Sequence, residues 1–421
     1  MKKVTFLSLV FTLAAYLVSA QPSNRVSAWN YLKSGDLKKA KEKIDKAINH
    51  PKTQKDPRTW YYRGLIYQEL AITKNPKYKS LVKDPLDTAF YAFEKALKYN
   101  FKDPELQKID FSKPEGIVKF MKALRDKKTK YVDREITMKV FMNYPALGNS
   151  FFNKGVENYN KKNYDRSFDN FEKSLYCTSF KGTPDTVVTY YAGLAAKKAG
   201  KYDKAIEYFK LAKQLKYGKT DKDKILLYKL LAETYLEKKD TANYVKTMKE
   251  GIETYPSESA LLLPDLINYY LNTKQNDKAL DYLNVAIEKD PNNPTYYYAR
   301  GNMYDLNLKQ YDKAEADYKK AIELKPDFYD AIYSLGAMLY NTGVETLKAA
   351  DDIEDLDKYN KKKNEALEYF KKALPYLEKA HELKPDDINP LISLKIIYYR
   401  LGQTDKYEEI KKQLDAMKKK Q

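Results

Sequence analysis

The chain has 421 residues, of which 43% are hydrophobic and 14% aromatic, with 40 tyrosines but only 14 glycines. This composition supports a buried core and excludes a collagen-like or intrinsically disordered chain. The formal net charge is +19, but lysines alternate with acidic residues, as on solvent-exposed helix faces. Charge alone therefore does not select a partner.

The first twenty residues have the pattern of a secretory signal peptide. Lys2 and Lys3 precede an apolar run over residues 4–18, and small residues end at Ala20. We predict cleavage between Ala20 and Gln21, which removes two lysines and leaves a net charge of +17. No cysteine follows the run, and no later segment is apolar enough to span a membrane. We therefore expect a periplasmic protein, or alternatively a secreted one, with no nucleic acid as partner and no transmembrane segment.

A helical pattern recurs along the remaining chain. A large residue stands three positions before a glycine, and small, large and small residues follow at i, i+4 and i+7, on one helix face. Small residues let neighbouring helices approach closely. The first part occurs at Tyr61/Gly64, Phe152/Gly155, Tyr190/Gly193, Tyr298/Gly301 and Tyr333/Gly336. The second part occurs at Ala89/Phe93/Ala96, Ser167/Phe171/Ser174, Ala205/Phe209/Ala212, Ala314/Tyr318/Ala321 and Ala373/Leu377/Ala380.

Prolines give the period of this pattern. Pro256, Pro291 and Pro326 are 35 residues apart, and Pro385 follows after 59. Self-similarity of this length is the signature of stacked repeats, in which each unit packs on its neighbours. The sequence therefore predicts an all-α solenoid.

These motifs resemble the tetratricopeptide repeat (TPR) family. Segments 60–67 and 297–304 match its first-helix pattern closely, and the resemblance covers nearly everything after residue 20. It implies a right-handed superhelical solenoid of helix–turn–helix units. The C-terminal part of the chain, where we predict an extended helical hairpin, also resembles exported repeat proteins of Gram-negative bacteria, in which such hairpins occur.

We predict five segments in chain order. Residues 1–20 are the signal peptide, and residues 21–100 are N-terminal repeats with an insertion. Residues 101–145 are a linking helical segment without a clear motif, and residues 146–326 are a regular array. Residues 327–421 hold C-terminal repeats, a long helical hairpin and a basic tail.

The hairpin follows from an insertion of roughly 24 residues over the ~34-residue period of the family. Its first helix is predicted to run from Tyr329 past Val344, and its second from near Asp357 to Leu383. At 1.5 Å per residue it would stand about 15–20 Å out of the stack. Its acidic tip, residues 351–357, lacks the spacing of a Ca²⁺ loop and is interpreted as a solvated turn.

Catalysis finds little support in the sequence. His50 and His381 are the only histidines and lie at opposite ends of the array, and no phosphate loop or nucleophile elbow occurs. Cys177 is the only cysteine, and we interpret it as a half-buried, inert thiol. We expect no enzyme, no cofactor and no metal.

The best candidate for a binding surface is the aromatic series. The resemblance implies that first helices line a concave face and that the residue three before each glycine points into it. Such a ladder would suit an extended peptide or a partner helix, because aromatics dominate interface energetics. Asn302 would add an amide for a peptide backbone. The candidate partner-binding residues are Tyr61, Phe152, Tyr190, Tyr298, Asn302 and Tyr333. The alternative is that these rings pack between adjacent first helices and only rim the groove.

We therefore predict a non-catalytic scaffold for protein–protein interactions in the cell envelope. Its partners would be proteins of an assembly, secretion or uptake complex, with the acidic hairpin tip as a second docking arm. The alternative is a binding module for an anionic envelope polymer, peptidoglycan or polysaccharide, attracted by the net charge. A third reading is self-association through an uncapped end of the stack.

Overall fold

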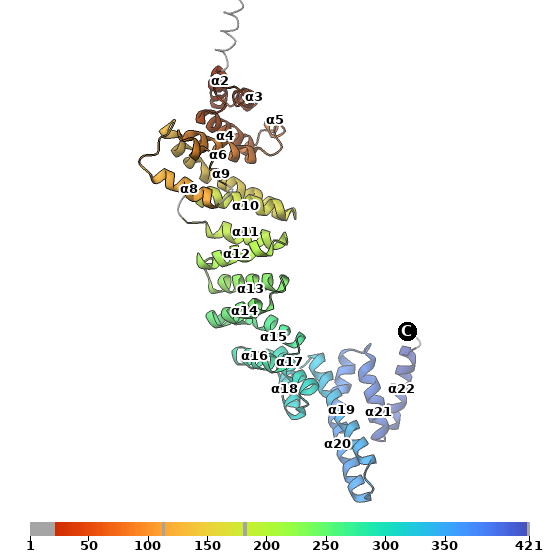
Figure 1. Ribbon diagram of the computed structural model, residues 1–421. Helices are drawn as coiled ribbons and strands as arrows, with labels where there is room; N and C mark the ends of the chain where they lie inside the picture. Colours follow the sequence, from red (N-terminus) through yellow and green to blue (C-terminus); the bar gives the residue numbers. More distant parts are fainter. Residues whose placement is uncertain (1–21, 112–113, 180–182, 419–421) are drawn as a thin grey trace, which may run out of the picture. The chain divides into compact units, whose positions relative to one another are not determined.

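The computed structural model describes residues 22–111, 114–179 and 183–418 (Figure 1). Over these residues the chain is helical, apart from an isolated antiparallel bridge between Phe101 and Tyr131. Among the helices described, none combines the length and the apolar character needed to cross a bilayer. The predicted signal peptide, residues 1–20, and the last lysines of the basic tail, Lys419 and Lys420, lie outside the described residues.

Contacts divide the chain into two compact units. The first holds the described residues up to 219 together with 233–240, and the second holds 220–232 together with 241 onward. In the first unit, consecutive helices pair: α2 (Pro22–Lys33) with α3 (Leu37–Ala47), α4 (Pro57–Ile72) with α6 (Pro85–Asn100), α9 (Arg134–Asn160) with α10 (Tyr164–Ser179), and α11 (Thr186–Lys198) with α12 (Tyr202–Gln214). The short helices α5 (Pro76–Lys79), α7 (Pro104–Gln107) and α8 (Pro114–Arg125) lie in the connections.

The second unit continues the same scheme. Helix α13 (Asp221–Glu237) contributes residues to both units and is followed by α14 (Thr241–Thr254) and the 3₁₀ turn η1 (Pro256–Leu261). The later pairs are α15 (Leu263–Asn272) with α16 (Asn276–Lys289), α17 (Pro294–Asn302) and the π turn η2 (Met303–Asn307) with α18 (Tyr311–Leu324), α19 (Tyr329–Asp351) with α20 (Leu356–Leu383), and α21 (Ile388–Arg400) with α22 (Thr404–Lys418). The predicted all-α repeat fold is confirmed.

The long C-terminal hairpin is confirmed as α19 and α20. A Cβ atom on Gly336 would lie 2.8 Å from Leu377, and one on Gly343 would lie 2.8 Å from Phe370. A glycine of α19 thus meets a large side chain of α20 at two places along the hairpin. The close packing of the two helices therefore continues beyond the length of an ordinary repeat. At the tip, Asp355 caps α20 by accepting a hydrogen bond from the Lys358 N–H at 2.9 Å.

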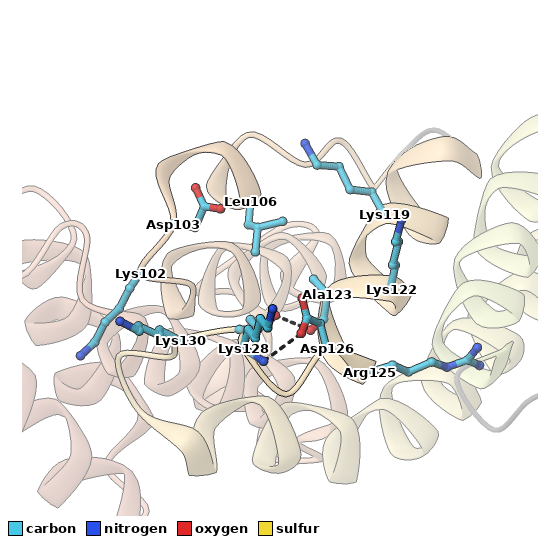
Figure 2. A pocket seen from close by; sticks show the side chains of 11 residues that line it. Lys102, Asp103, Leu106, Lys119, Lys122, Ala123, Arg125, Asp126, Lys128 and Lys130 are labelled. Atoms are coloured by element: carbon cyan, nitrogen blue, oxygen red, sulfur yellow. Dashed lines mark hydrogen bonds between the residues drawn. The ribbon is translucent and has the colours of Figure 1, made fainter.

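The segment between α6 and α9 forms an excursion whose two ends lie side by side. The bridge between Phe101 and Tyr131 closes it, and buried Asn100 donates to Thr137 Oγ1 at 2.9 Å and accepts from the Asp133 N–H at 2.9 Å. Figure 2 shows the side chains that line the hollow of this excursion. The predicted segment boundary between residues 145 and 146 falls inside α9, which continues through Pro145. Its apolar stripe is uninterrupted there, so burial offsets the hydrogen bond that proline removes.

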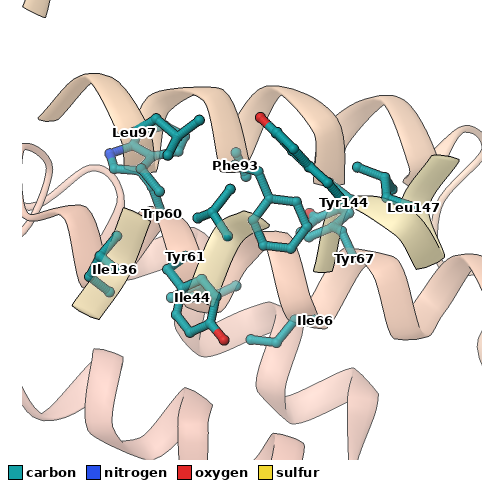
Figure 3. Packing of buried hydrophobic residues seen from close by; sticks show 14 of the residues in the cluster. Ile44, Trp60, Tyr61, Ile66, Tyr67, Phe93, Leu97, Ile136, Tyr144 and Leu147 are labelled. Atoms are coloured by element: carbon teal, nitrogen blue, oxygen red, sulfur yellow. The ribbon is translucent and has the colours of Figure 1, made fainter. Parts of the chain in front are cut away.

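The main core cluster of the first unit contains nine buried aromatic residues among aliphatic ones (Figure 3). Trp60 is 5% exposed and donates from Nε1 to the Gln54 carbonyl at 2.7 Å, while Trp29 stacks on Tyr62 with 4.7 Å between ring centroids. Cys177 is buried completely rather than by half, and burial raises the pKa of its thiol. The thiol is therefore protonated and shielded, as an inert cysteine should be.

In seven of the helix pairs, the turn between the two helices uses a residue in the left-handed backbone region. Gly35, Gly200 and Gly402 have φ between 71° and 76°, whereas Lys162, Lys239, Lys274 and Lys309 occupy the corresponding turns with φ between 55° and 65°. A Cβ atom costs about 1–2 kcal/mol in this region, so the lysine turns are strained. This strain is local and on exposed positions.

Relief of that strain should stabilise the chain. We expect Lys162→Gly/Lys239→Gly/Lys274→Gly to raise the free energy of unfolding by about 1–2 kcal/mol, since glycine's greater freedom when unfolded offsets part of the gain. Thermal denaturation would measure it. The triple alanine variant at the same positions is the control and should show no gain. Equal stabilisation by alanine would contradict the strain argument.

Candidate protein-binding surface

In four repeats the predicted ladder residue packs beside a ring that rests on the motif glycine. A Cβ atom on each glycine would lie between 2.4 and 2.9 Å from that ring; the pairs are Gly64/Phe93, Gly155/Phe171, Gly193/Phe209 and Gly301/Tyr318. The ladder residues lie 5.6–6.4 Å from the same rings, centroid to centroid: Tyr61, Phe152, Tyr190 and Tyr298. Each ladder ring therefore supports the second helix of its own repeat, a contact that the sequence interpretation did not include.

The three ladder residues of the first unit differ in burial. Tyr61 is only 9% exposed and lies within the core cluster (Figure 3), so it presents little surface to a partner. Phe152 is half-buried and packs edge-on against Tyr191 at 5.6 Å. Tyr190 is also half-buried and stacks on Tyr217 at 4.2 Å with the ring planes 8° apart.

In the second unit the structure brings Asn302 and Tyr333 into one cleft, which we call the α17–α19 cleft. It has a volume of about 250 Å³. Its lining residues come from α17, η2, α18, α19 and the turn before α18: Asn302, Asp305, Leu306, Lys309, Tyr311, Tyr318, Tyr333, Ser334, Ala337, Met338, Asn341, Thr342 and Glu345. Tyr298 is not among them, but it is half-buried beside Phe328, 5.2 Å between ring centroids.

The floor of the cleft is polar. The Tyr318 hydroxyl lies 2.7 Å from Asn302 Oδ1, to which it donates, and 3.3 Å from Asp305 Oδ2. Burial raises the pKa of Asp305 and that of Tyr318, whose phenol is also disfavoured as an anion by the neighbouring carboxylate. Within the described residues the Asn302 Nδ2 group makes no hydrogen bond, so both of its N–H groups are free for a ligand.

One extra residue shapes the mouth of this cleft. Gly301 and Tyr311 are ten residues apart, whereas Gly193 and Tyr202 in another repeat are nine apart. The extra residue is accommodated in the π turn η2, where the Leu308 N–H donates to the Met303 carbonyl at 3.0 Å. Leu306 in this turn is 64% exposed and lines the cleft. The longer spacing was visible in the sequence, and it could have identified the site.

Next to α19, helix α21 exposes an apolar stripe, Ile392, Ile396 and Tyr399, which we call the α21 stripe. These side chains are 46%, 36% and 67% exposed, and they lie at i, i+4 and i+7 on one helix face. Ile392 and Tyr333 are each the fifth residue of their helices, and α19 packs against α21. The opposite side of α21 is buried. The apolar residues at 392, 396 and 399, on the face opposite the buried one, were the sequence signal for this second candidate surface, which the sequence analysis missed.

No group of three or more His, Cys, Asp or Glu side chains in the described part of the chain is arranged to hold a metal ion. The α17–α19 cleft instead offers amide, hydroxyl and carboxylate groups beside the exposed apolar side chain of Leu306. This combination can hydrogen-bond a peptide backbone and bury apolar side chains.

Comparison with known proteins gives one family match. A family model described as a tetratricopeptide repeat matches residues 294–328, which hold α17, η2 and α18. Solved structures that resemble the chain include the C-terminal part of a TPR repeat-containing protein from Cytophaga hutchinsonii, at 17% identity over 63% of this chain and 95% of that chain, with a TM-score of 0.45. A TPR repeats protein from Bacteroides fragilis is 25% identical over 65% of this chain and 99% of that chain, with a TM-score of 0.29. YrrB, a TPR protein with an unusual peptide-binding site, is 20% identical over 44% and 90%, with a TM-score of 0.31. No curated protein matches the sequence.

Proposed function

We propose that the chain is a tetratricopeptide repeat protein that acts as a non-catalytic scaffold, with its partner site in the second unit. The support is the match of residues 294–328 to a model of this family, whose members bind protein partners. The site combines the α17–α19 cleft with the α21 stripe. The observation that carries the proposal is the joining of Asn302 and Tyr333 in a cleft whose mouth holds the exposed Leu306.

The chemistry of this surface fits an amphipathic helix or extended peptide. Exposed apolar side chains at i, i+4 and i+7 of α21 match the apolar face of a partner helix. The polar groups of Asn302, Ser334 and Asn341 suit the backbone or polar side chains of the same segment. The rings of Phe152, Tyr190 and Tyr298 stay predicted contacts, and their half-burial favours supporting roles.

Substitutions on α19 and α21 can test this site. We expect Ala337→Arg, which fills the α17–α19 cleft, and Ile396→Asp, which places a charge in the α21 stripe, to weaken binding of the partner at least about tenfold, because they affect the centre of the interface. Ala349→Arg is the matched control, since Ala349 is exposed on the same helix outside the cleft.

The measurement has two stages. Proteins captured from native envelope extract by the unmodified chain are identified first, and their affinities for the three variants are then measured with purified components. Far-UV circular dichroism checks that each variant remains helical. If all three variants bind the captured protein as tightly as the unmodified chain does, the proposed site is refuted. If only Ala349→Arg loses affinity, the binding site lies elsewhere on α19.

We further propose that the protein acts in the periplasm, within an envelope complex for assembly, secretion or uptake. The support is the N-terminal pattern of Lys2 and Lys3, the apolar run over 4–18 and the small residues up to Ala20. Cell fractionation with intact-mass measurement tests it, and the expected product is a periplasmic chain that begins at Gln21. An unprocessed chain in the cytosol would contradict export.

A further inference from the structure

The excursion between α6 and α9 encloses a second hollow, of about 870 Å³, which we call the basic cleft (Figure 2). Six of its lining residues are cations and two are carboxylates. The cations are Lys102, Lys119, Lys122, Arg125, Lys128 and Lys130. The cleft lies in the first unit, so the inference drawn from it does not depend on the proposed partner site.

The cations of the basic cleft are not neutralised within the described structure. All six are exposed, and none forms an ion pair with a described residue; Lys119 Nζ lies 3.5 Å from the Glu105 carbonyl oxygen. Elsewhere lysines commonly pair with a glutamate one helical turn away, as Lys139 does with Glu135 at 2.6 Å. The excess positive charge of this cleft is therefore available to an anion.

Both carboxylates of the cleft are already engaged by backbone donors. Asp103 accepts from the Glu105 N–H at 2.9 Å, and Asp126 accepts from the Lys128 N–H at 2.8 Å (Figure 2). These bonds hold the turns that carry the cations. The acidic groups thus shape the cleft, while the cations surround it.

A folded frame supports this arrangement. Phe120 packs edge-on against Phe111 at 4.9 Å and against Phe101 at 5.8 Å, centroid to centroid, and all three rings are buried. The Thr129 hydroxyl donates to the Ala123 carbonyl at 2.7 Å, and the Lys102 N–H donates to the Lys130 carbonyl at 2.9 Å. The backbone that carries the cations is therefore fixed, which lowers the entropy lost on binding.

We propose that the basic cleft binds an acidic segment of a partner protein. The cations stand apart around the rim, with Lys102 and Lys130 on one side and Lys119 and Lys122 on the other (Figure 2), which suits charges spread along a chain better than one compact anion. Five of the six are lysines, which act as point charges and lack the bidentate geometry of arginine for phosphate. Leu106, which is half-buried, adds apolar surface for the side chains of a peptide.

The test uses the purified chain and a fluorescein-labelled oligoglutamate peptide, with an oligoglutamine peptide of equal length as the uncharged probe. Fluorescence anisotropy should show binding of the glutamate peptide alone, weakening as salt is added. Lys119→Gln/Lys122→Gln should weaken it roughly threefold to tenfold, because each removes one charge contact. The matched control is Lys198→Gln/Lys222→Gln, which removes two exposed lysines outside the cleft.

Three results would overturn the proposal. Equal weakening by the control pair would show attraction by net charge rather than by this cleft. Equal binding of the glutamine peptide would show that carboxylates are not recognised. Tighter binding of dextran sulfate than of the glutamate peptide would assign the cleft to an anionic polysaccharide. All four lysines are exposed, so the variants should fold, and circular dichroism verifies this.

Discussion

Phe93→Ala should lower the free energy of unfolding of the first unit by about 3–5 kcal/mol, the range for removal of a fully buried ring. Phe93 is 0% exposed, and its ring rests on Gly64, between Tyr61 at 6.1 Å and Tyr144 at 6.4 Å. Its loss leaves a cavity between the two helices of one repeat and the neighbouring α9. Urea denaturation followed by far-UV circular dichroism measures the change.

A double-mutant cycle tests whether a glycine is needed at position 64 because the ring of Phe93 packs against it. Gly64→Ala alone should cost about 1–3 kcal/mol, because its Cβ atom would lie 2.4 Å from Phe93 Cε1. With Phe93→Ala the obstruction is gone, and alanine gains up to about 1 kcal/mol of helix propensity. The pair should therefore be less destabilised than the sum of the single variants by about 2 kcal/mol. Gly64→Ala with Phe209→Ala, in a different repeat, should be additive; additivity at Gly64 and Phe93 would contradict the packing argument.

The second large effect depends on pH and concerns Glu94 on α6. Burial raises the pKa of Glu94 to about 7. Asp110 raises this pKa further, and Lys98, the hydroxyl of Tyr176 and Lys173 lower it. Tyr144 and Cys177 face the same carboxyl group and are themselves kept neutral by burial. The folded chain therefore holds this proton to higher pH than the unfolded chain does.

The direction of the pH effect on stability follows from this difference in pKa between the folded and the unfolded chain. Below the unfolded pKa near 4.5, Glu94 is protonated in both the folded and the unfolded chain, and the free energy of unfolding keeps its full value. This free energy falls as the pH rises to about 7, because the unfolded chain then releases the proton while the folded chain still holds it. We expect a loss of about 2 kcal/mol, less than the full value for this displacement, because part of the side chain reaches solvent.

Glu94→Gln should remove this pH dependence. The variant should be more stable than the unmodified chain by about 2 kcal/mol near pH 8 and nearly equal to it near pH 4.5. Urea denaturation at several pH values measures the difference. Glu69→Gln, at an exposed position on α4, is the control. Parallel stability curves for Glu94→Gln and the unmodified chain would contradict the assignment.

The repeat architecture could be predicted because it is encoded over short distances. Gly193 and Phe209 stand in fixed places within one helix pair, and their contact needs no knowledge of the rest of the chain. The hairpin bounds followed for the same reason, since the Gly336–Leu377 contact fixes the register of α19 against α20.

The candidate sites depend on neighbours that the motif does not specify. Tyr61 and Tyr333 hold the same motif position, yet Tyr61 is buried and Tyr333 lines a cleft, because α9 packs against α4 in the first unit. The π turn arises from one additional residue, which leaves the apolar pattern unchanged. The basic cleft lies in a segment that lacks the motif, and its form depends on the contacts of Asn100 with residues more than thirty positions away.

The positions of the two tryptophans make them an intrinsic fluorescence probe of one unit. Trp29 and Trp60 are its only tryptophans, and both lie in the first unit, whereas helices that contribute to far-UV circular dichroism occur in both units. Indole emission therefore follows the melting of one unit, and circular dichroism follows the melting of both. Coincident transitions would mean that the repeat array unfolds as a single cooperative body, and separate transitions would resolve the order in which its units open, without any introduced dye.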